Sequence, residues 1–192
     1  IDQDGVIQGQ LAERSPRLVA DGRTFSYVVH DTPTNRLFIT QNDVRAIQLA
    51  KAALRAGIEL LMRHAGVTEV HDIRLAGAFG SHIDPLHALV LGLVPDCPVA
   101  QVRSVGNAAG AGAVRALLSV AARREMEAAV RNVVKIETAT EPEFQAQFVA
   151  AMAFPHAAAP SPHLSTVVTL PARSTTSNER GRRRRRSEKE ES

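Results

Sequence analysis

Cysteine and aromatic residues are scarce in this 192-residue chain, which has one Cys, one Tyr, six Phe and no Trp. The single cysteine, Cys97, excludes a disulfide within the chain. It also excludes any zinc or iron–sulfur site that needs several cysteines of this chain. A reducing, cytoplasmic setting is therefore favoured. Because aromatic side chains are few, we expect a core built mainly from Ala, Val, Leu and Ile.

Long apolar runs are absent from the sequence as well. No segment approaches the roughly 20 apolar residues that a membrane span requires, and the first residues lack a signal-peptide pattern. The hydrophobic fraction of 44% and the charged fraction of 22% are typical of an ordinary folded domain. We expect no membrane partner. Because the chain begins with Ile1 rather than Met, we also expect it to be a piece of a longer polypeptide.

Most of the chain lacks an excess of either positive or negative charge. Residues 1–155 hold 15 basic and 16 acidic side chains, whereas eight basic and four acidic side chains follow from His156 onward. The net charge of +3 therefore comes from the carboxyl-terminal segment. We do not expect the folded part to bind nucleic acid.

The carboxyl-terminal segment differs in composition from the rest. Pro, Ala and Ser dominate after Pro155, and the Arg182–Arg186 run and an acidic end follow. Such a segment buries too little apolar area to fold, so we predict a folded domain over 1–155 and a disordered tail over 156–192. The arginine run could make nonspecific nucleic-acid contacts through counterion release, but a solvating tail explains it equally well.

Apolar periodicity predicts alternating strands and helices in the first 155 residues. Strands are expected at 25–29, 37–39, 73–76, 99–105 and 133–136, and helices at 40–66, 85–92, 106–118, 120–132 and 142–152. This order is typical of an α/β fold, in which helices cover a partly parallel sheet.

The strongest local pattern lies in residues 40–66. Thr40 and Asp43 have the spacing of a capping box, and Gly66 is a suitable end for a helix. Apolar residues at helical spacing are expected to face the core: Ile47, Ala50, Leu54, Ile58 and Leu61. Lys51 and Arg55 fall on the other side, where we expect solvent.

Two glycine-containing segments follow expected strands. Gly77 to Gly80 comes after strand 73–76, and Gly106 to Gly112 comes after strand 99–105. Glycines at the carboxyl end of a strand let a ligand approach the main chain, and a helix amino terminus offers free N–H groups. The alternative is that these glycines only satisfy turn geometry or close helix packing, and for Gly110 the packing explanation is favoured.

A metal site is not predicted. His82, Asp84 and His87 lie close in sequence, but their spacing does not suit one helix face and no HExxH pattern is present. Cys97 has no neighbouring base that would mark it as a nucleophile, and we expect it in an exposed loop.

Five segments, taken in order, resemble a known family: ITQNDVRAIQLAKAALRAGIELLMRHAG, LAGAFGSHIDP, GLVPDCP, VGNAAGAGA and FQAQFVAAMAFP. They are similar to the carboxyl-terminal region of the ATP-dependent reductive activators of corrinoid proteins. In that family an ASKHA domain, named after acetate and sugar kinases, Hsc70 and actin, is joined to a ferredoxin-like domain. The resemblance covers most of residues 1–155.

The resemblance implies a ribonuclease-H-like lobe, with a mixed sheet flanked by helices, that forms the carboxyl-terminal half of an ATPase. It implies ATP and Mg²⁺ as cofactors, a corrinoid protein of a methyltransferase system as partner, and reduction of cob(II)alamin to cob(I)alamin as function. Homodimerisation is left open. The residues that it implies for nucleotide contact are Gly77, Ala78, Phe79, Gly80, Asp84, Gly106, Asn107 and Gly110. It assigns no catalytic residue.

The chain also departs from the family. The [2Fe–2S] cluster of the family belongs to an amino-terminal domain, and this chain has no cysteine set to bind one. An Asp-x-Gly-Thr-Thr phosphate motif is missing, and Ala78 stands where the family commonly has a second glycine. A docking module for a corrinoid protein that does not hydrolyse ATP therefore remains the alternative.

Overall fold

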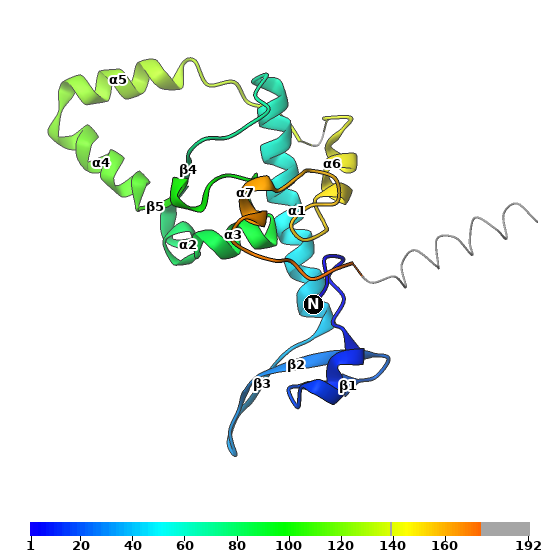
Figure 1. The fold of residues 1–192 in the computed structure, drawn as a ribbon. Helices are drawn as coiled ribbons and strands as arrows, with labels where there is room; N and C mark the ends of the chain where they lie inside the picture. Colours follow the sequence, from blue (N-terminus) through cyan, green and yellow to red (C-terminus); the bar gives the residue numbers. More distant parts are fainter. Residues whose placement is uncertain (139, 174–192) are drawn as a thin grey trace, which may run out of the picture.

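The computed structural model describes residues 1–138 and 140–173 (Figure 1). The strands are β1 (Leu18–Asp21), β2 (Thr24–Asp31), β3 (Arg36–Ile39), β4 (Ile73–Ala76) and β5 (Val102–Gly106). The α-helices are α1 (Gln41–His64), α2 (Gly77–His82), α3 (Pro85–Leu91), α4 (Ala108–Leu118), α5 (Val120–Val130), α6 (Phe144–Ala150) and α7 (Pro162–Ser165). Two 3₁₀ helices, η1 (Gly9–Arg14) and η2 (Val99–Gln101), complete the elements.

The described strands form two sheets rather than the single mixed sheet that we expected. β1, β2 and β3 form an antiparallel sheet in that order, and β4 pairs with β5 in parallel. The long helix α1 connects the two sheets (Figure 1). The α/β class is confirmed, whereas β1 had no counterpart among the expected strands.

Three of the expected elements differ from the structure. Residues 133–136 are not a strand, because no described strand lies beside them to exchange hydrogen bonds. Residues 99–101 form η2 after Pro98, so that β5 begins only at Val102. The segment 77–82, expected as a loop, is helix α2.

Helix α1 begins where the sequence predicts. Asp43 N donates to Thr40 Oγ1 at 3.2 Å, and Thr40 N donates to Asp43 Oδ2 at 2.8 Å, which confirms the capping box. The backbone and side-chain hydrogen bonds from Thr40 lower the pKa of Asp43. The helix then runs without a break for 24 residues to His64.

The buried face of α1 is not the face that we predicted. Ile47 and Leu54 are 45% and 48% exposed, and Ile58 is half-buried. Three polar side chains are buried instead, with exposed fractions of at most 4%: Gln48, Lys51 and Arg55. We predict solvent exposure for Lys51 and Arg55 from the sequence and make no prediction for Gln48. All three line the side of α1 that packs against the rest of the chain. The prediction was wrong because this side of α1 faces main-chain carbonyl groups, which polar side chains satisfy and aliphatic ones cannot.

We call Gln48, Lys51 and Arg55 the polar stripe of α1. Its carbonyl partners come from distant loops: Gln48 Nε2 donates to Met152 O at 2.9 Å and Asp4 O at 3.1 Å, Lys51 Nζ to Pro155 O at 2.9 Å and to Ala153 O, and Arg55 Nη1 to Val94 O at 2.7 Å. Arg55 Nε also donates to Glu59 at 2.6 Å. These bonds fasten the chain around residues 152–155 to the centre of α1.

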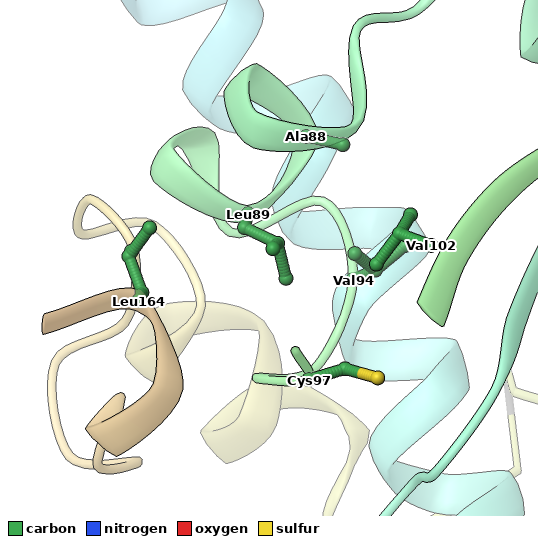
Figure 2. Packing of buried hydrophobic residues seen from close by; sticks show 6 residues of the cluster. All are labelled: Ala88, Leu89, Val94, Cys97, Val102 and Leu164. Atoms are coloured by element: carbon green, nitrogen blue, oxygen red, sulfur yellow. The ribbon is translucent and has the colours of Figure 1, made fainter. Parts of the chain in front are cut away.

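The apolar core lies beside this stripe, between α3, β5 and α7. Its buried members are Ala88, Leu89, Val94, Cys97, Val102 and Leu164 (Figure 2). Cys97 is fully buried, so our expectation of an exposed thiol is wrong. Burial is the largest cause that raises the pKa of this thiol, which suits a packing residue rather than a nucleophile.

The segment after residue 155 is packed, contrary to our prediction of a disordered tail. Leu164 of α7 is only 1% exposed, and Val168 and Leu170 pack against the same core. Asp96 holds the start of α7, because its carboxylate accepts hydrogen bonds from the backbone N–H groups of His163 and Leu164 at 2.8 and 3.0 Å. The predicted tail over residues 174–192 lies outside the described residues.

Gly92 allows the chain at Pro155 to approach α3. It ends α3 with φ of 69°, and a Cβ atom at this position would lie 1.8 Å from the carbonyl oxygen of Pro155. Only glycine fits both the left-handed backbone and this contact.

Among the described helices, none is long and apolar enough to cross a bilayer.

The burial of Lys51 predicts a pH dependence of stability. Burial, and then the charge of Arg55, lowers its pKa from 10.5 to about 7. Between these pH values the unfolded chain binds a proton that the folded chain does not, so the contribution of Lys51 to stability rises with pH. Relative to Lys51→Met, the unfolding free energy of the wild type should rise by up to about 1.4 kcal/mol per pH unit from pH 7 to 10. Urea unfolding of both proteins across this range measures the difference, and parallel curves would contradict the prediction.

The packing of Leu164 predicts that the segment after residue 155 stabilises the fold. Leu164→Ala should lower the free energy of unfolding by about 2–4 kcal/mol, because it leaves a cavity in the core. Leu117→Ala is a matched control at a side chain that is 78% exposed, and it should change the value by less than about 0.5 kcal/mol. Equal effects of the two substitutions in thermal or urea unfolding would show that α7 does not support the core.

Candidate functional site

The parallel pairing of β4 and β5 brings the two glycine segments to one place. Ala76 is in register with Gly106, so both strands end at the same edge of the sheet. Gly77 follows β4 directly, and Asn107 follows β5. We call Gly77, Gly106 and Asn107 the glycine edge. In open α/β sheets the carboxyl ends of the strands are where ligands bind.

Both glycines of this edge have left-handed backbones. Gly77 has φ of 87° and Gly106 has φ of 64°. Apart from the chain neighbours of each glycine and, for Gly77, the backbone of α2, no described atom lies within 4 Å of the place where a Cβ would stand. The left-handed backbone therefore requires glycine at positions 77 and 106, whereas crowding by distant atoms does not. The same open space leaves the main chain accessible to a ligand.

The amino terminus of α4 offers hydrogen-bond donors beside Gly106. Asn107 caps the helix, because its Oδ1 accepts from Gly110 N at 2.9 Å and its main-chain oxygen accepts from Ala111 N at 3.0 Å. The N–H groups of Ala108 and Ala109 have no hydrogen-bond partner among the described residues. Free N–H groups and the positive end of the helix dipole attract anions such as phosphate.

Gly80 and Gly110 have packing reasons for being glycine. A Cβ at Gly80 would lie 2.7 Å from the carbonyl carbon of Leu75, so α2 could not pack against the end of β4. A Cβ at Gly110 would lie 2.6 Å from Asn107 Nδ2, in the cap itself. Ligand contact at these two positions remains a prediction, and the structure does not require it to explain the glycines.

The remaining predicted contacts lie on α2 and at the start of α3. Ala78 and Phe79 belong to the first turn of α2, which has no side-chain cap. Asp84 caps α3, because its Oδ1 accepts from His87 N at 2.9 Å. Among the described residues, no hydrogen bond or ion pair joins Asp84 to the glycine edge. It records no cluster of three metal-ligating side chains there either.

Positive side chains near this sheet point away from the glycine edge. Asp72, which precedes β4, accepts hydrogen bonds from Arg74 at 2.8 Å and from Arg103 at 2.7 Å. These bonds lower the pKa of Asp72, with Arg103 the larger cause. Because Asp72 lies at the opposite end of the strands from Gly77, both guanidinium groups are engaged there. Any attraction for an anion at the glycine edge therefore comes from backbone groups.

A cavity of about 910 Å³ also lies toward the amino-terminal end of β4 and β5 rather than at the glycine edge. It is lined by the polar side chains of Arg55, Glu59, Asp72, Asp96 and Arg103, among others. These groups are already engaged: Arg55 with Glu59, Asp72 with Arg103, and Asp96 with the start of α7. These five side chains therefore already have protein partners.

The sequence missed two features of this region. It did not show that the glycine segment after β4 is helical, because six residues are too few for a clear helical period. It also did not identify the N–H groups of Ala108 and Ala109 as free donors. The available signal was Asn107, because asparagine is common at the residue that caps the start of a helix.

Comparisons with known proteins agree with the motif-based resemblance. The family model of the C-terminal domain of RACo, the ASKHA domain, matches residues 1–165. The corrinoid activation enzyme RamQ of Eubacterium limosum is 44% identical over 110 residues, which are 56% of this chain and 18% of RamQ. A solved structure of a reductive activator for a corrinoid, iron-sulfur protein matches with a TM-score of 0.68 and 26% identity, over 81% of this chain and 26% of that chain.

The match to the family model covers most of the chain, and the solved structure has the same fold over a similar extent. The predicted family is therefore confirmed, although the chain spans only about a fifth to a quarter of the length of these two relatives. The chain belongs to the family of the C-terminal ASKHA domain of RACo.

Proposed function

We propose that this chain is the nucleotide-binding part of an ATP-dependent activator that returns the inactive cob(II)alamin of a corrinoid protein to cob(I)alamin. The relatives are named as a corrinoid activation enzyme and a reductive activator for a corrinoid, iron-sulfur protein, which supports this role. The observation that carries the nucleotide site is the glycine edge, where two open glycine backbones lie beside the free N–H groups of Ala108 and Ala109.

The glycine edge suits a phosphate group for three reasons. The backbone at Gly77 and Gly106 is open to close approach, the amides of Ala108 and Ala109 are donors without partners, and the dipole of α4 is positive at this end. Mg²⁺, when it accompanies ATP, neutralises phosphate charge and is bound mainly by phosphate oxygens, water and one or two carboxylates. The residues of this chain bind and orient the phosphates through their main chain.

In the described part of the chain, the arginines near the glycine edge are engaged elsewhere and do not supply the charge that hydrolysis needs. Arg74 and Arg103 are held by Asp72 at the far end of the strands, and Arg115 of α4 pairs with Glu125 at 2.9 Å. Phosphoryl transfer depends on cations and donors that surround the phosphates from several sides. We infer that further parts of an activator supply the opposite wall of the site and the electron source.

Other parts of the proposal follow from the family. The partner is a corrinoid protein of a methyltransferase system, the setting is cytoplasmic, and an iron–sulfur cluster belongs to a domain outside this chain. A docking module for the corrinoid protein without ATP binding is the competing function, and the two differ in whether the glycine edge binds phosphate.

The Asn107→Asp substitution tests the phosphate site. Aspartate caps a helix as well as asparagine does, so the fold should persist, but the new carboxylate repels phosphate. We expect ATP affinity to fall about three- to tenfold and adenosine affinity to change little. Titration followed by the NMR amide signals of Gly77, Gly106 and Ala108 measures both ligands in the millimolar range.

Ser119→Asp is the matched control, because Ser119 caps α5 in the same way, through Ala122 N at 3.2 Å, and lies outside the glycine edge. It should leave ATP affinity unchanged. If saturating ATP moves none of the three amide signals, or if both variants bind ATP like the wild type, the docking function replaces the nucleotide-binding one.

The charge distribution also predicts that this chain alone does not turn over ATP. Phosphate release from ATP and Mg²⁺ should stay at the uncatalysed background, because the glycine edge offers amides while the nearby described arginines, Arg74, Arg103 and Arg115, are paired with carboxylates. A steady-state assay with purified chain at several concentrations tests this. Release that scales with the concentration of the chain would show that the phosphates bind elsewhere in the molecule.

A further inference from the structure

Residues 158–173 form a segment that we call the strap, which packs over the apolar core. The chain just before it is fixed, because the polar stripe of α1 binds carbonyl groups of residues 152–155. Leu164, in the middle of the strap, belongs to the core (Figure 2). Arg173, at its end, donates to Ala157 O at 3.1 Å. The strap is therefore a loop that begins and ends at the same fixed segment.

The turn that starts the strap is built on the ring of His156. Ala159 N donates to His156 Nδ1 at 2.9 Å, and Ala158 N donates to the same atom at 3.2 Å. A side-chain acceptor that binds the N–H groups two and three residues ahead fixes a turn, as Asn and Asp do elsewhere. Because Nδ1 accepts, the neutral ring holds its proton on Nε2. Both bonds exist only while Nδ1 carries no proton.

The ring of His156 is buried beside positive charge. The residue is 8% exposed, and Nε2 has no hydrogen-bond partner among the described residues. Burial is the first cause that lowers the pKa of His156 below its ordinary value of 6.5, and the charge of Arg55 is the second. Lys51 acts in the same direction, whereas Glu59 acts in the opposite one. The closed strap therefore favours the neutral ring.

The carboxylates near the ring are already engaged. Glu59 accepts from Arg55 Nε at 2.6 Å. Asp96 lines the same small cavity as His156, but it binds the N–H groups at the start of α7. On the strap, Arg173 donates to His156 O at 3.4 Å and adds a further positive charge. Within the described chain, no hydrogen bond or ion pair joins a carboxylate to the ring, so a charged ring would be buried without a counterion.

We propose that His156 is an acid-sensitive latch of the strap. A proton added to Nδ1 breaks the bonds from Ala158 and Ala159 and turns the acceptor into a second donor, so the turn comes apart. The strap then detaches from the core at its start, while residues 152–155 stay bound to the polar stripe. This inference goes beyond the proposed function and does not depend on nucleotide binding at the glycine edge.

The direction of the pH effect follows from the two states of the ring. In the open strap His156 is in water, where its ordinary pKa of 6.5 applies, and in the closed strap the pKa is lower. The open state therefore binds the proton more readily, and acid favours opening. Between the lowered pKa and 6.5, the open fraction should grow by up to about tenfold for each pH unit that the solution is acidified.

Opening of the strap changes more than the turn. Leu164 would leave the core, and one wall of the cavity of about 910 Å³ would move with it. The residues of the strap that line this cavity are Ala159, Pro160, Pro162 and His163. Mild acid should thus open the cavity and uncover apolar side chains of α3 without unfolding α1.

Amide hydrogen exchange of the whole chain at about pH 7 and about pH 5.5 tests the latch. After correction for the pH dependence of the intrinsic exchange rate, protection of Ala159, Ser165 and Val168 should fall about three- to tenfold at the lower pH. The amides in the centre of α1 should keep their protection. In His156→Asn the fall should disappear, because Asn Oδ1 accepts the same N–H groups and does not titrate. Lys51 is present in both proteins, so their difference reports the ring alone.

His163→Asn is the matched control, since it removes an exposed histidine of the same strap. It should lose protection with acid as the wild type does. A wild-type strap equally protected at both pH values, or a His156→Asn strap that still responds to acid, would overturn the latch. Parallel loss of protection in α1 would do the same, because acid would then unfold the whole chain.

A second measurement keeps the test decisive if His156→Asn does not fold. The ring of His156 in the wild type can be titrated by NMR through its carbon-bound protons, alongside the amide signals of Ala158 and Ala159. The ring and the two amides should change with one midpoint, below pH 6.5, at which the strap also loses half of its protection. Separate midpoints for the ring and the strap would show that another group controls the opening.

Discussion

The arrangement of this molecule depends on the polar stripe of α1. Gln48, Lys51 and Arg55 cross one face of the helix and donate to main-chain oxygens that lie about 40 to 100 residues away in sequence. Burying such groups is costly unless each finds a partner, so the segments that carry those oxygens are held in place. Residues 152–155 are fixed against α1 in this way, and the close approach of Pro155 to Gly92 then ties the same segment to α3 and the core.

This stripe also explains which parts of the fold the sequence could predict. The capping box at Thr40 and Asp43 is a local signal, and the helix begins where it indicates. Burial is not local. The row of Ile47 and Leu54 has the spacing of a core-facing side, but the most buried side of α1 is the adjacent one that carries Lys51 and Arg55. A hydrophobic period shows that one face will be covered, and it does not show whether the described chain is what covers it.

For the candidate site, too, the sequence predicted the local features and not the contacts across the fold. The sequence placed glycines after two strands, and parallel pairing brought Gly77 and Gly106 to one edge as an α/β fold requires. Individual roles could not be read in advance, because they depend on contacts across the fold. Glycine is needed at position 80 because a Cβ there would collide with the main chain of Leu75. Asp84 caps the first turn of α3 by accepting a hydrogen bond from His87 N. The packing of α7 was missed for a related reason: composition suggests disorder, whereas two hydrogen bonds to Asp96 and the burial of Leu164 hold that short helix.

The two-stranded sheet of β4 and β5 and the glycine edge are linked through β4. The strand ends at Ala76, directly before Gly77, so its end and the end of β5 bring main-chain groups of both segments to the same edge of the sheet. Main-chain amides on one side of a phosphate position it without supplying the charge that hydrolysis needs.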